Sequence, residues 1–391
     1  MGQVAVALET KVAPAGSVSD LPWDLLAPPR VPVARPRLVP MAGVLPYLIS
    51  LDDSRTYSNF GPLNQRFEAR LAERFGLTPD CVVTCASATA GLTMALQRAA
   101  AGRGGYCLMP AWTFAATAHA AISAGLTPWL LDVEIDTGLL TPGIVEDAIR
   151  RVPGRVAAVV PVAAYGLPVD TVAWDAFQTS TGIDVIIDAA AGFDRHVAGD
   201  ALAVVSLHAT KVFGIGEGGF LISRDPAAIA DIRRRSNFGF DNSREAALHG
   251  GNGKLSEIGA AVGLAGLDFW PVQRLSYLSV LHYYRTALAG VPQLKFAEGL
   301  GETWVSATCN IEAPAPLAQE IERRLGQVGI ATRRWWGRGL HTHPAFDTSP
   351  RLDLSVTDGL AARTLGLPCY PDVAEPDLAQ VSAIVRDVLR A

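Results

Sequence analysis

Two charged residues stand directly after short apolar segments of the chain. Asp188 ends the run Val185-Ile-Ile-Asp188, and Lys211 ends Ser206-Leu-His-Ala-Thr-Lys211, which begins in an apolar segment beside a glycine-rich loop. A lysine amine forms a Schiff base with a cofactor aldehyde. An aspartate that faces a pyridine nitrogen keeps it protonated, so that the ring can accept electrons. The pair therefore indicates pyridoxal phosphate (PLP) chemistry, although each residue alone is equally compatible with a surface lysine or a loop-capping aspartate.

Two further segments provide groups that such a cofactor needs. Ser87-Ala88-Thr89 directly precedes a predicted helix, and the backbone N–H groups at a helix start bind phosphate well. Pro110-Ala-Trp112-Thr-Phe114 places two aromatic rings after a predicted strand, where a ring could stack on a flat cofactor. Both segments also have an ordinary structural explanation, since serine and threonine are common helix N-caps and aromatic rings are common in cores.

The elements that would position these groups alternate between strand and helix. We expect helices that open at Pro62 and Pro142, helices at 88–101, 114–124 and 171–181, and strands at 82–84, 106–109, 128–131, 156–162, 185–187, 204–206 and 220–223. Strands that are apolar throughout are buried on both faces, which predicts an α/β fold with a mainly parallel central sheet. Ligands of such sheets bind beyond the carboxyl ends of the strands.

The chain divides into three predicted parts. Residues 1–45 contain several prolines and little periodicity, which is typical of an extended arm. Residues 46–275 form the large domain with the sheet, and residues 276–391 form a smaller C-terminal α+β domain. Across and beyond the boundary we expect a long helix at 255–288, a strand near 304–311, and helices near 315–328 and 377–389.

The order of the motifs resembles the DegT/DnrJ-type family of PLP-dependent sugar aminotransferases over nearly the whole chain after the arm. The matching segments are Tyr57-Ser-Asn-Phe-Gly61-Pro62, Ser87-Ala-Thr-Ala-Gly-Leu92, Asp188-Ala-Ala, Ser206-Leu-His-Ala-Thr-Lys211 with Gly216-Glu-Gly-Gly219, Gly251-Asn252-Gly-Lys-Leu-Ser256, Leu354-Ser-Val-Thr-Asp358 and Leu365-Gly-Leu-Pro368. The resemblance implies the PLP-dependent transferase fold of type I.

The resemblance also implies a role for individual residues. Lys211 would carry the Schiff base and move protons between substrate and cofactor, and Asp188 would face the pyridine nitrogen. The resemblance implies that Ala88, Thr89 and Ser206 bind the cofactor phosphate. It implies that Phe114, or as second choice Trp112, stacks on the cofactor ring. Asn252 would bind the phosphate of the cofactor in a neighbouring subunit. The role of Asn252 implies a homodimer in which two chains build each site.

One position departs from the family pattern, and one segment is expected near the substrate. Three residues after Asp188 the family has Gln or His, which binds the phenolic oxygen of the cofactor, whereas this chain has Ala191. That hydrogen bond, worth about 0.5–1.5 kcal/mol, is therefore either absent or supplied by water or His208. In the family the stretch 333–343 lies near the substrate pocket, so Arg338 and His341 are expected to contact substrate.

The implied activity is the transfer of an amino group from an amino acid, with glutamate expected, to a keto sugar that is typically nucleotide-linked. Relatives that replace the lysine with histidine are dehydratases, so Lys211 favours transamination with ping-pong kinetics. The alternatives are a non-sugar cyclic ketone as acceptor and a non-catalytic, regulatory PLP-binding protein.

Two other classes of enzyme have weaker support. Gly214-Ile-Gly216-Glu-Gly-Gly219 fits G-x-G-x-x-G, which would suggest an NAD-dependent oxidoreductase, but that motif needs a following helix and a strand is expected here. His341-Thr-His343 with Asp347 has poor spacing for a metal site, so no metal is expected.

Composition excludes several further classes. The chain has 391 residues, of which 49% are apolar and 18% charged, and a formal net charge of −5. This composition indicates a folded core, and the mild acidity argues against nucleic-acid binding. The longest segment without acidic or basic residues, 104–131, is interrupted by prolines and glycines, which argues against a membrane span. Five cysteines without a C-x-x-C pair indicate buried thiols in the cytoplasm.

Overall fold

The computed structural model describes residues 28–391. Most of the predicted arm, residues 1–27, therefore lies outside the described residues. The described part of the arm is extended up to Pro40 and packs on the C-terminal part of the chain, where Val31 pairs with Ile330 and the Cys369 amide donates to the Val33 carbonyl oxygen. Helix α1 (Met41–Ser54) then begins inside the range predicted as arm.

The central sheet has seven strands in the order β1-β7-β6-β5-β4-β2-β3. Their bounds are β1 (Val82–Cys85), β2 (Tyr106–Pro110), β3 (Thr127–Leu131), β4 (Val156–Val159), β5 (Asp184–Asp188), β6 (Leu202–Ser206) and β7 (Gly219–Ile222). Strand β7 is antiparallel to both neighbours, and the remaining neighbouring pairs are parallel. The expectation of a mainly parallel α/β sheet is confirmed.

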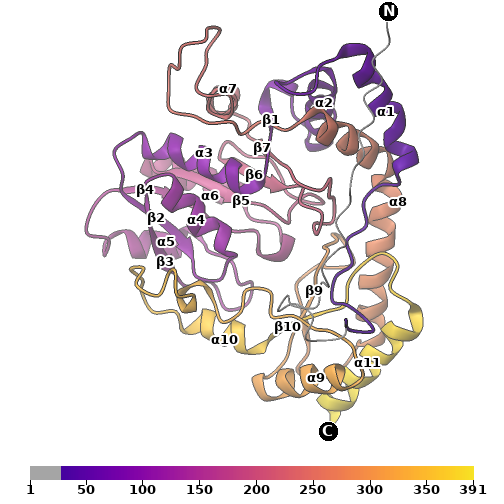
Figure 1. Ribbon diagram of the computed structural model, residues 1–391. Coiled ribbons are helices and arrows are strands. Elements are labelled where there is room, and N and C mark those ends of the chain that lie inside the picture. Colours follow the sequence, from indigo (N-terminus) through magenta and orange to yellow (C-terminus); the bar gives the residue numbers. More distant parts are fainter. Residues whose placement is uncertain (1–27) are drawn as a thin grey trace, which may run out of the picture.

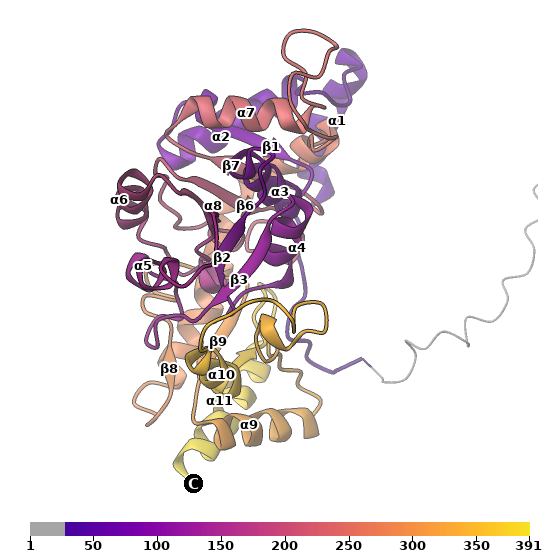
Figure 2. The same ribbon diagram turned by 90° about the vertical axis from the view of Figure 1, so that its left-hand side faces the viewer.

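Helices cover both faces of this sheet, which is why its strands are apolar throughout. Figure 2 shows α3 and α4 on one side of the sheet and α5 and α6 on the other. The helices of this domain are α2 (Pro62–Phe75), α3 (Ala88–Ala100), α4 (Ala115–Ser123), α5 (Pro142–Ile149), α6 (Thr171–Thr181) and α7 (Pro226–Ser236), with short 3-10 turns at η2 (Pro79–Cys81) and η3 (Ala164–Gly166). Side-chain caps fix four starts, because Ser87, Thr141, Asp170 and Asp225 each accept a backbone N–H of the first turn.

One long helix joins the two parts of the molecule. Helix α8 (Glu257–Ala287) extends along one side of the molecule (Figure 1), packing on α1 and α2 at one end and on α11 at the other. The predicted boundary between residues 275 and 276 falls inside this helix. Because a continuous helix resists bending, the two domains are tied together at this side.

The C-terminal domain is a three-stranded antiparallel sheet with helices packed around it. Its order is β10-β9-β8, and Figure 1 places it below the large domain. The elements are β8 (Lys295–Phe296), β9 (Cys309–Glu312), α9 (Ala315–Gln327), η4 (Leu340–Thr342), α10 (Ser355–Arg363), β10 (Thr364–Leu367) and α11 (Glu375–Arg390). The strand expected at 304–311 starts only at Cys309, and α10 and β10 were not among the predicted elements.

A buried carboxylate, that of Asp194, links the two domains. Asp194, with a side chain 4% exposed, lies 2.8 Å from Arg274 on α8 and 3.7 Å from Arg74 on α2. Its second oxygen accepts the Val305 amide at 2.9 Å. Asp194 thus joins the loop after β5 to α2, α8 and the C-terminal domain.

Within residues 28–391, no helix has the length and apolar character needed to cross a membrane.

Candidate active site

The predicted catalytic residues meet where two parallel strands end. Strand β5 ends at Asp188, the adjacent strand β6 ends at Ser206, and the register pairs Asp188 with Val204. The loops beyond these ends surround a cavity of about 450 Å³. The sequence-predicted residues that line it are Lys211, Asp188, Ala88, Thr89, Ser206, Phe114 and His208.

Asp188 forms a buried and well-ordered carboxylate. Thr117 donates its hydroxyl to one oxygen at 2.8 Å, and the Ala190 amide donates to the other at 3.1 Å. Thr113 contacts the same Thr117 hydroxyl at 2.8 Å. Burial raises the pKa of Asp188, while these hydrogen bonds and the charge of Lys211 act in the opposite direction. The net direction is a raised pKa, so the two hydrogen bonds and the Lys211 charge offset only part of the cost of burying this carboxylate.

Lys211 lies in a tight loop that directs it into the cavity lining. The Lys211 amide donates to the His208 carbonyl oxygen at 2.9 Å, and the Ile215 amide donates to the Leu207 carbonyl oxygen at 2.8 Å. A side chain at Gly214 would meet the Ala209 backbone at 2.9 Å, so this turn requires glycine. Burial lowers the pKa of Lys211, and the Asp188 charge partly opposes that effect. A lowered pKa makes the neutral amine more available.

The start of α3 forms a cradle of backbone amides at the cavity wall. Ser87 uses its hydroxyl to accept the Ala90 amide, which leaves Ala88 and Thr89 in the first turn facing the lining. A side chain at Gly219 would meet the Ala88 nitrogen at 2.7 Å, so glycine allows β7 to approach this turn. The Ser206 hydroxyl accepts the His208 amide at 3.2 Å, and Ser206 pairs with Gly219 of β7, which places it beside this turn. This arrangement suits a phosphate group.

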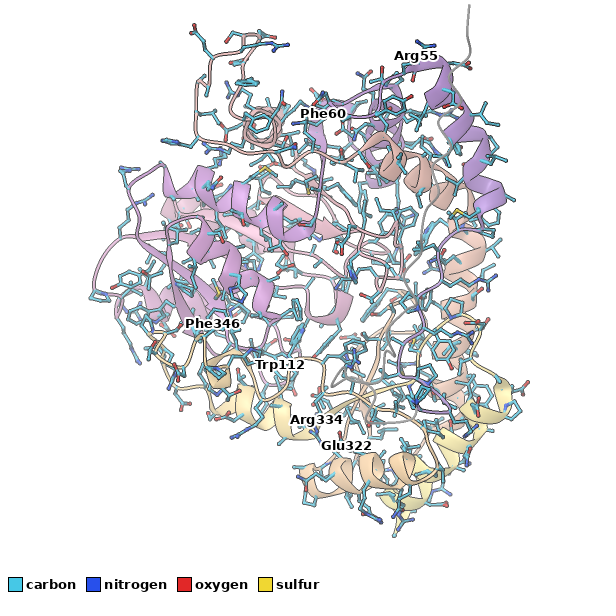
Figure 3. The ribbon with its side chains drawn as sticks, in the orientation of Figure 1. Arg55, Phe60, Trp112, Glu322, Arg334 and Phe346 are labelled. Carbon is cyan, nitrogen blue, oxygen red and sulfur yellow. The ribbon has the colours of Figure 1, made fainter. Side chains whose placement is uncertain are left out.

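The two aromatic candidates occupy different places. Phe114 lines the cavity and is 62% exposed, so its ring is accessible to a ligand. Trp112 is buried and does not line this cavity. It packs edge-on against Trp336 with ring centroids 5.1 Å apart, at the junction of the two domains where Figure 3 labels it. Trp336 in turn stacks on Tyr165 with centroids 4.1 Å apart. Trp112 therefore supports an aromatic wall from behind.

The position of the unusual alanine is small and apolar. Ala191 lines the cavity together with Val162, Ala163 and Ala190. His208 does not face it freely, because its Nδ1 lies 2.8 Å from the Thr210 hydroxyl and its Nε2 lies 3.5 Å from Glu217. The cavity thus combines a buried carboxylate, a lysine, an amide cradle and an apolar wall. These residues fit PLP, whose ring is flat and apolar and whose ends carry a pyridine nitrogen, an aldehyde and a phosphate.

Besides Trp112, three predicted residues lie outside the lining of this cavity. Asn252 is exposed on the loop between α7 and α8, which extends away from the body of the molecule in Figure 1. Arg338 is exposed. His341 lies 3.1 Å from Asp358, on a turn that the Leu340 amide anchors to the Ala111 carbonyl oxygen.

Sequence reasoning missed several residues of the site. Thr117 was part of a predicted helix with no sign of its contact to Asp188, which lies 71 residues away in the chain. Tyr165, Ser306 and Thr308 at the domain junction were also missed, and Arg333, Trp335 and Trp336 were not singled out within the stretch 333–343 that was expected near the substrate. The adjacent tryptophans and arginines were the only available signal, because aromatic and arginine residues concentrate at binding sites.

The structure also bears on the two alternative enzyme classes. The glycines 214–219 run directly into strand β7, which starts at Gly219. A dinucleotide fingerprint needs a helix at that point, so this alternative is wrong. In the part of the chain that the structure describes, no group of three or more His, Cys, Asp or Glu side chains could hold a metal ion.

A mainly parallel α/β sheet with a lysine, a buried aspartate and an amide cradle at adjacent strand ends defines a PLP-dependent transferase of fold type I. The model of the DegT/DnrJ/EryC1/StrS aminotransferase family matches residues 44–386, and the chain belongs to this family. It is a PLP-dependent aminotransferase of a family that acts on sugars, as the resemblance implied.

Comparisons with known proteins agree on fold and activity. A dTDP-4-amino-4,6-dideoxy-D-glucose transaminase of Shigella dysenteriae is 28% identical over 370 residues, which cover 91% of this chain and 98% of that protein. The structure of DesI with its TDP-sugar product has a TM-score of 0.81 and 32% identity, covering 93% of this chain and 94% of DesI. A Bacillus cereus protein described as a PLP-dependent aminotransferase has a TM-score of 0.85 and 30% identity, covering 91% and 99%.

Proposed function

We propose that this enzyme moves the amino group of glutamate to the keto group of a nucleotide-linked sugar, in a ping-pong reaction catalysed by a homodimer. The observation that carries the proposal is that Lys211 and Asp188 meet in one cavity of about 450 Å³, a size typical of small-molecule sites. A nucleotide-linked acceptor is supported by the TDP-sugar product of DesI and by the name of the Shigella relative.

When bound, PLP would supply an aldehyde that takes up the amino group and a ring that accepts electrons from the substrate. Asp188 would hold a proton on the pyridine nitrogen. The Thr117 hydroxyl and the Ala190 amide would keep the Asp188 carboxylate ionised and in place. Ala88, Thr89 and Ser206 would hold the phosphate, because all three line the cavity and Gly219, the strand partner of Ser206, packs against the start of α3.

Lys211 would be the acid and base of both half-reactions. Its burial lowers its pKa, so the neutral amine that accepts a proton is more available near neutral pH. We assign to its Nζ the movement of a proton between the substrate carbon and the cofactor carbon. Phe114 would cover the cofactor ring, with Trp112 supporting the wall of the cavity through Trp336. His208 would contribute to the cofactor environment from its place in the lining.

A second copy of the chain would complete the site. The exposed loop that carries Asn252 is suited to reach a neighbouring subunit. Large apolar side chains are exposed on two helices that pack together, α1 and α8, and include Met41, Leu45, Ile49, Phe269 and Val272. Exposed apolar side chains gathered on packed helices favour an interface. Arg338 and His341, outside the lining, would contact parts of the sugar nucleotide that extend beyond the cavity.

The five cysteines are free and buried, which favours a reducing compartment such as the cytoplasm.

The proposed reaction is tested with ¹⁵N-labelled glutamate and dTDP-4-keto-6-deoxyglucose, with the sugar product analysed by mass spectrometry. The proposal predicts an amino sugar nucleotide that carries the label. Labelling of a cyclic ketone without a nucleotide, and not of the nucleotide sugar, would instead favour the non-sugar alternative.

A further inference from the structure

The charged side chains that line the cavity differ in whether a group of opposite charge lies nearby. Lys211 and Asp188 lie at the strand ends and influence each other's pKa. Glu217 lies 3.5 Å from His208. Arg333 also lines the cavity, but from the C-terminal domain, and it forms no ion pair with any carboxylate among residues 28–391. The cavity therefore contains one cationic side chain that has no role in the chemistry assigned so far.

Arg333 is exposed, and contacts of its backbone and its guanidinium support it. Its backbone exchanges two hydrogen bonds with Gly366 on β10, at 3.0 and 2.8 Å. Its guanidinium carbon lies 4.8 Å from the centre of the Trp335 ring, a separation typical of cation–π contacts. A side chain at position 366 would collide with the Trp335 indole, so glycine makes room for this ring. These contacts support the guanidinium in the absence of a ligand.

The neighbouring arginine shows a contrasting environment. Arg334 lies 3.1 Å from Glu322 of α9 and donates to the carbonyl oxygens of Ala361 and Ala362. Figure 3 labels Arg334 and Glu322 next to each other in the C-terminal domain. Arg334 therefore holds the C-terminal domain together, whereas Arg333 directs its charge to the cavity. The two adjacent arginines therefore differ in function, since Arg334 is structural and Arg333 faces the cavity.

We propose that Arg333 forms an anion-binding subsite that positions the substrates, and this inference rests on the proposed function. In a ping-pong reaction one cavity receives two substrates in turn, and in this case both carry an anion. The amino donor has carboxylates, and a nucleotide-linked sugar has phosphates. A guanidinium binds either group with two parallel hydrogen bonds. The stacked Trp336 and Tyr165 beside it provide an apolar face for the uncharged part of each substrate.

The test measures anion binding without turnover. The PLP-loaded enzyme, in which the phosphate cradle is already filled, is titrated by calorimetry with glutarate and separately with pyrophosphate. Glutarate has the two carboxylates of the donor but no amino group, so it cannot react. Arg333→Gln is expected to weaken binding by about tenfold or more, since hydrogen bonds to charged groups are worth about 1.5–3 kcal/mol. Arg333→Lys, which retains charge but not the planar fork, should recover part of the affinity.

The matched control is Arg103→Gln, which removes the same charge from an exposed turn outside the cavity lining. It should bind both anions as wild type does. Weaker binding of glutarate alone by Arg333→Gln would support a subsite for the donor, and weaker binding of pyrophosphate alone would support one for the acceptor. Equal affinity of Arg333→Gln and Arg103→Gln for both anions would overturn the inference. This result does not depend on amination of a keto sugar, so it separates the subsite from the proposed reaction.

Discussion

The floor and the rim of the cavity are built in different ways. The floor consists of Asp188, the last residue of β5, and Lys211, which lies in the loop that follows β6. The rim comes from distant parts of the chain and combines Tyr165 with the C-terminal segments 306–308 and 333–336. The floor is fixed by the sheet, whereas the rim depends on how two domains pack. We infer that the floor determines the reaction and the rim determines which substrates reach it.

The largest effect is expected at the floor, from Lys211→Ala. This variant lacks the amine assigned to proton transfer, so the turnover number should fall by about 10³-fold or more, in the range of general acid–base catalysis. The rate is measured as keto acid released from glutamate in the presence of an acceptor. Lys295→Ala, a lysine with a side chain 73% exposed, serves as control and should retain wild-type turnover. Substantial activity in Lys211→Ala would remove the distinction between floor and rim.

The second floor residue should give a smaller but clear loss. Asp188→Asn keeps the shape but removes the charge that Thr117 and Ala190 stabilise. A charged hydrogen bond is worth about 1.5–3 kcal/mol, so the affinity for PLP should fall by about 10- to 100-fold. Equilibrium titration of the apoenzyme with PLP gives this value. Asp184→Asn, at the other end of the same strand, should leave the affinity unchanged. Equal affinity in both variants would count against the role of Asp188.

The loop that connects floor and rim should be sensitive to acid. His196 is buried, neither of its ring nitrogens has a hydrogen-bond partner among residues 28–391, and burial lowers its pKa to about 4. The unfolded chain takes up a proton on this histidine below about pH 6.5, whereas the folded chain does not until about pH 4, so stability falls as the pH falls through this window. The loss amounts to about 1.4 kcal/mol per pH unit.

His196→Leu removes this contribution, so its unfolding free energy should fall less between pH 6.5 and 5.5 than that of the wild type. Urea unfolding at both pH values provides the comparison. The same pH dependence in variant and wild type would show that His196 titrates equally in both states.

A contribution of the neighbouring subunit to the rim is tested by Asn252→Ala. Because Asn252 would reach the phosphate of the cofactor bound by the other chain, the variant should lose PLP on dialysis about tenfold faster, as expected for one lost charged hydrogen bond. Binding of PLP and dimer formation should weaken together. Asn242→Ala, in the same exposed loop, is the control. Retention of PLP as in wild type would contradict the shared site.

The smallest effect is expected from Ala191→Gln at the apolar wall. This change restores the side chain typical of the family and adds one hydrogen bond worth about 0.5–1.5 kcal/mol. The fold should remain intact, and the pH at which the visible absorption of the bound cofactor changes should shift by up to about one unit. A spectrophotometric titration identical to that of wild type would show that this position does not contact the cofactor.

The sequence predicted the floor well because its information is local. Asp188 and Lys211 each follow an apolar strand in a recognisable motif, and strand ends of a parallel sheet meet at one edge. The order of the strands and most helices in the large domain was predicted for the same reason, since each has its own apolar pattern, whereas helix α7 was not among the predicted elements. Ser87 and Thr141 were also visible as caps before helices.

The rim could not be predicted because its contacts join residues that are far apart in the chain. Tyr165 and Trp336 stack across the domain junction, and no local pattern indicates such a pair. Arg338 was preferred over Arg333 in the same segment, although only Arg333 lines the cavity. The Arg333 backbone pairs with Gly366, and β10, the strand that contains this glycine, was not among the predicted elements.

The most direct test of the account is the visible absorption spectrum of the purified enzyme during one complete cycle. Glutamate should bleach the yellow colour of bound PLP, and dTDP-4-keto-6-deoxyglucose should then restore it, because both half-reactions use the same Lys211 and the same cavity. A protein that does not take up PLP, or a yellow protein that glutamate and other amino acids leave unchanged, would contradict the account.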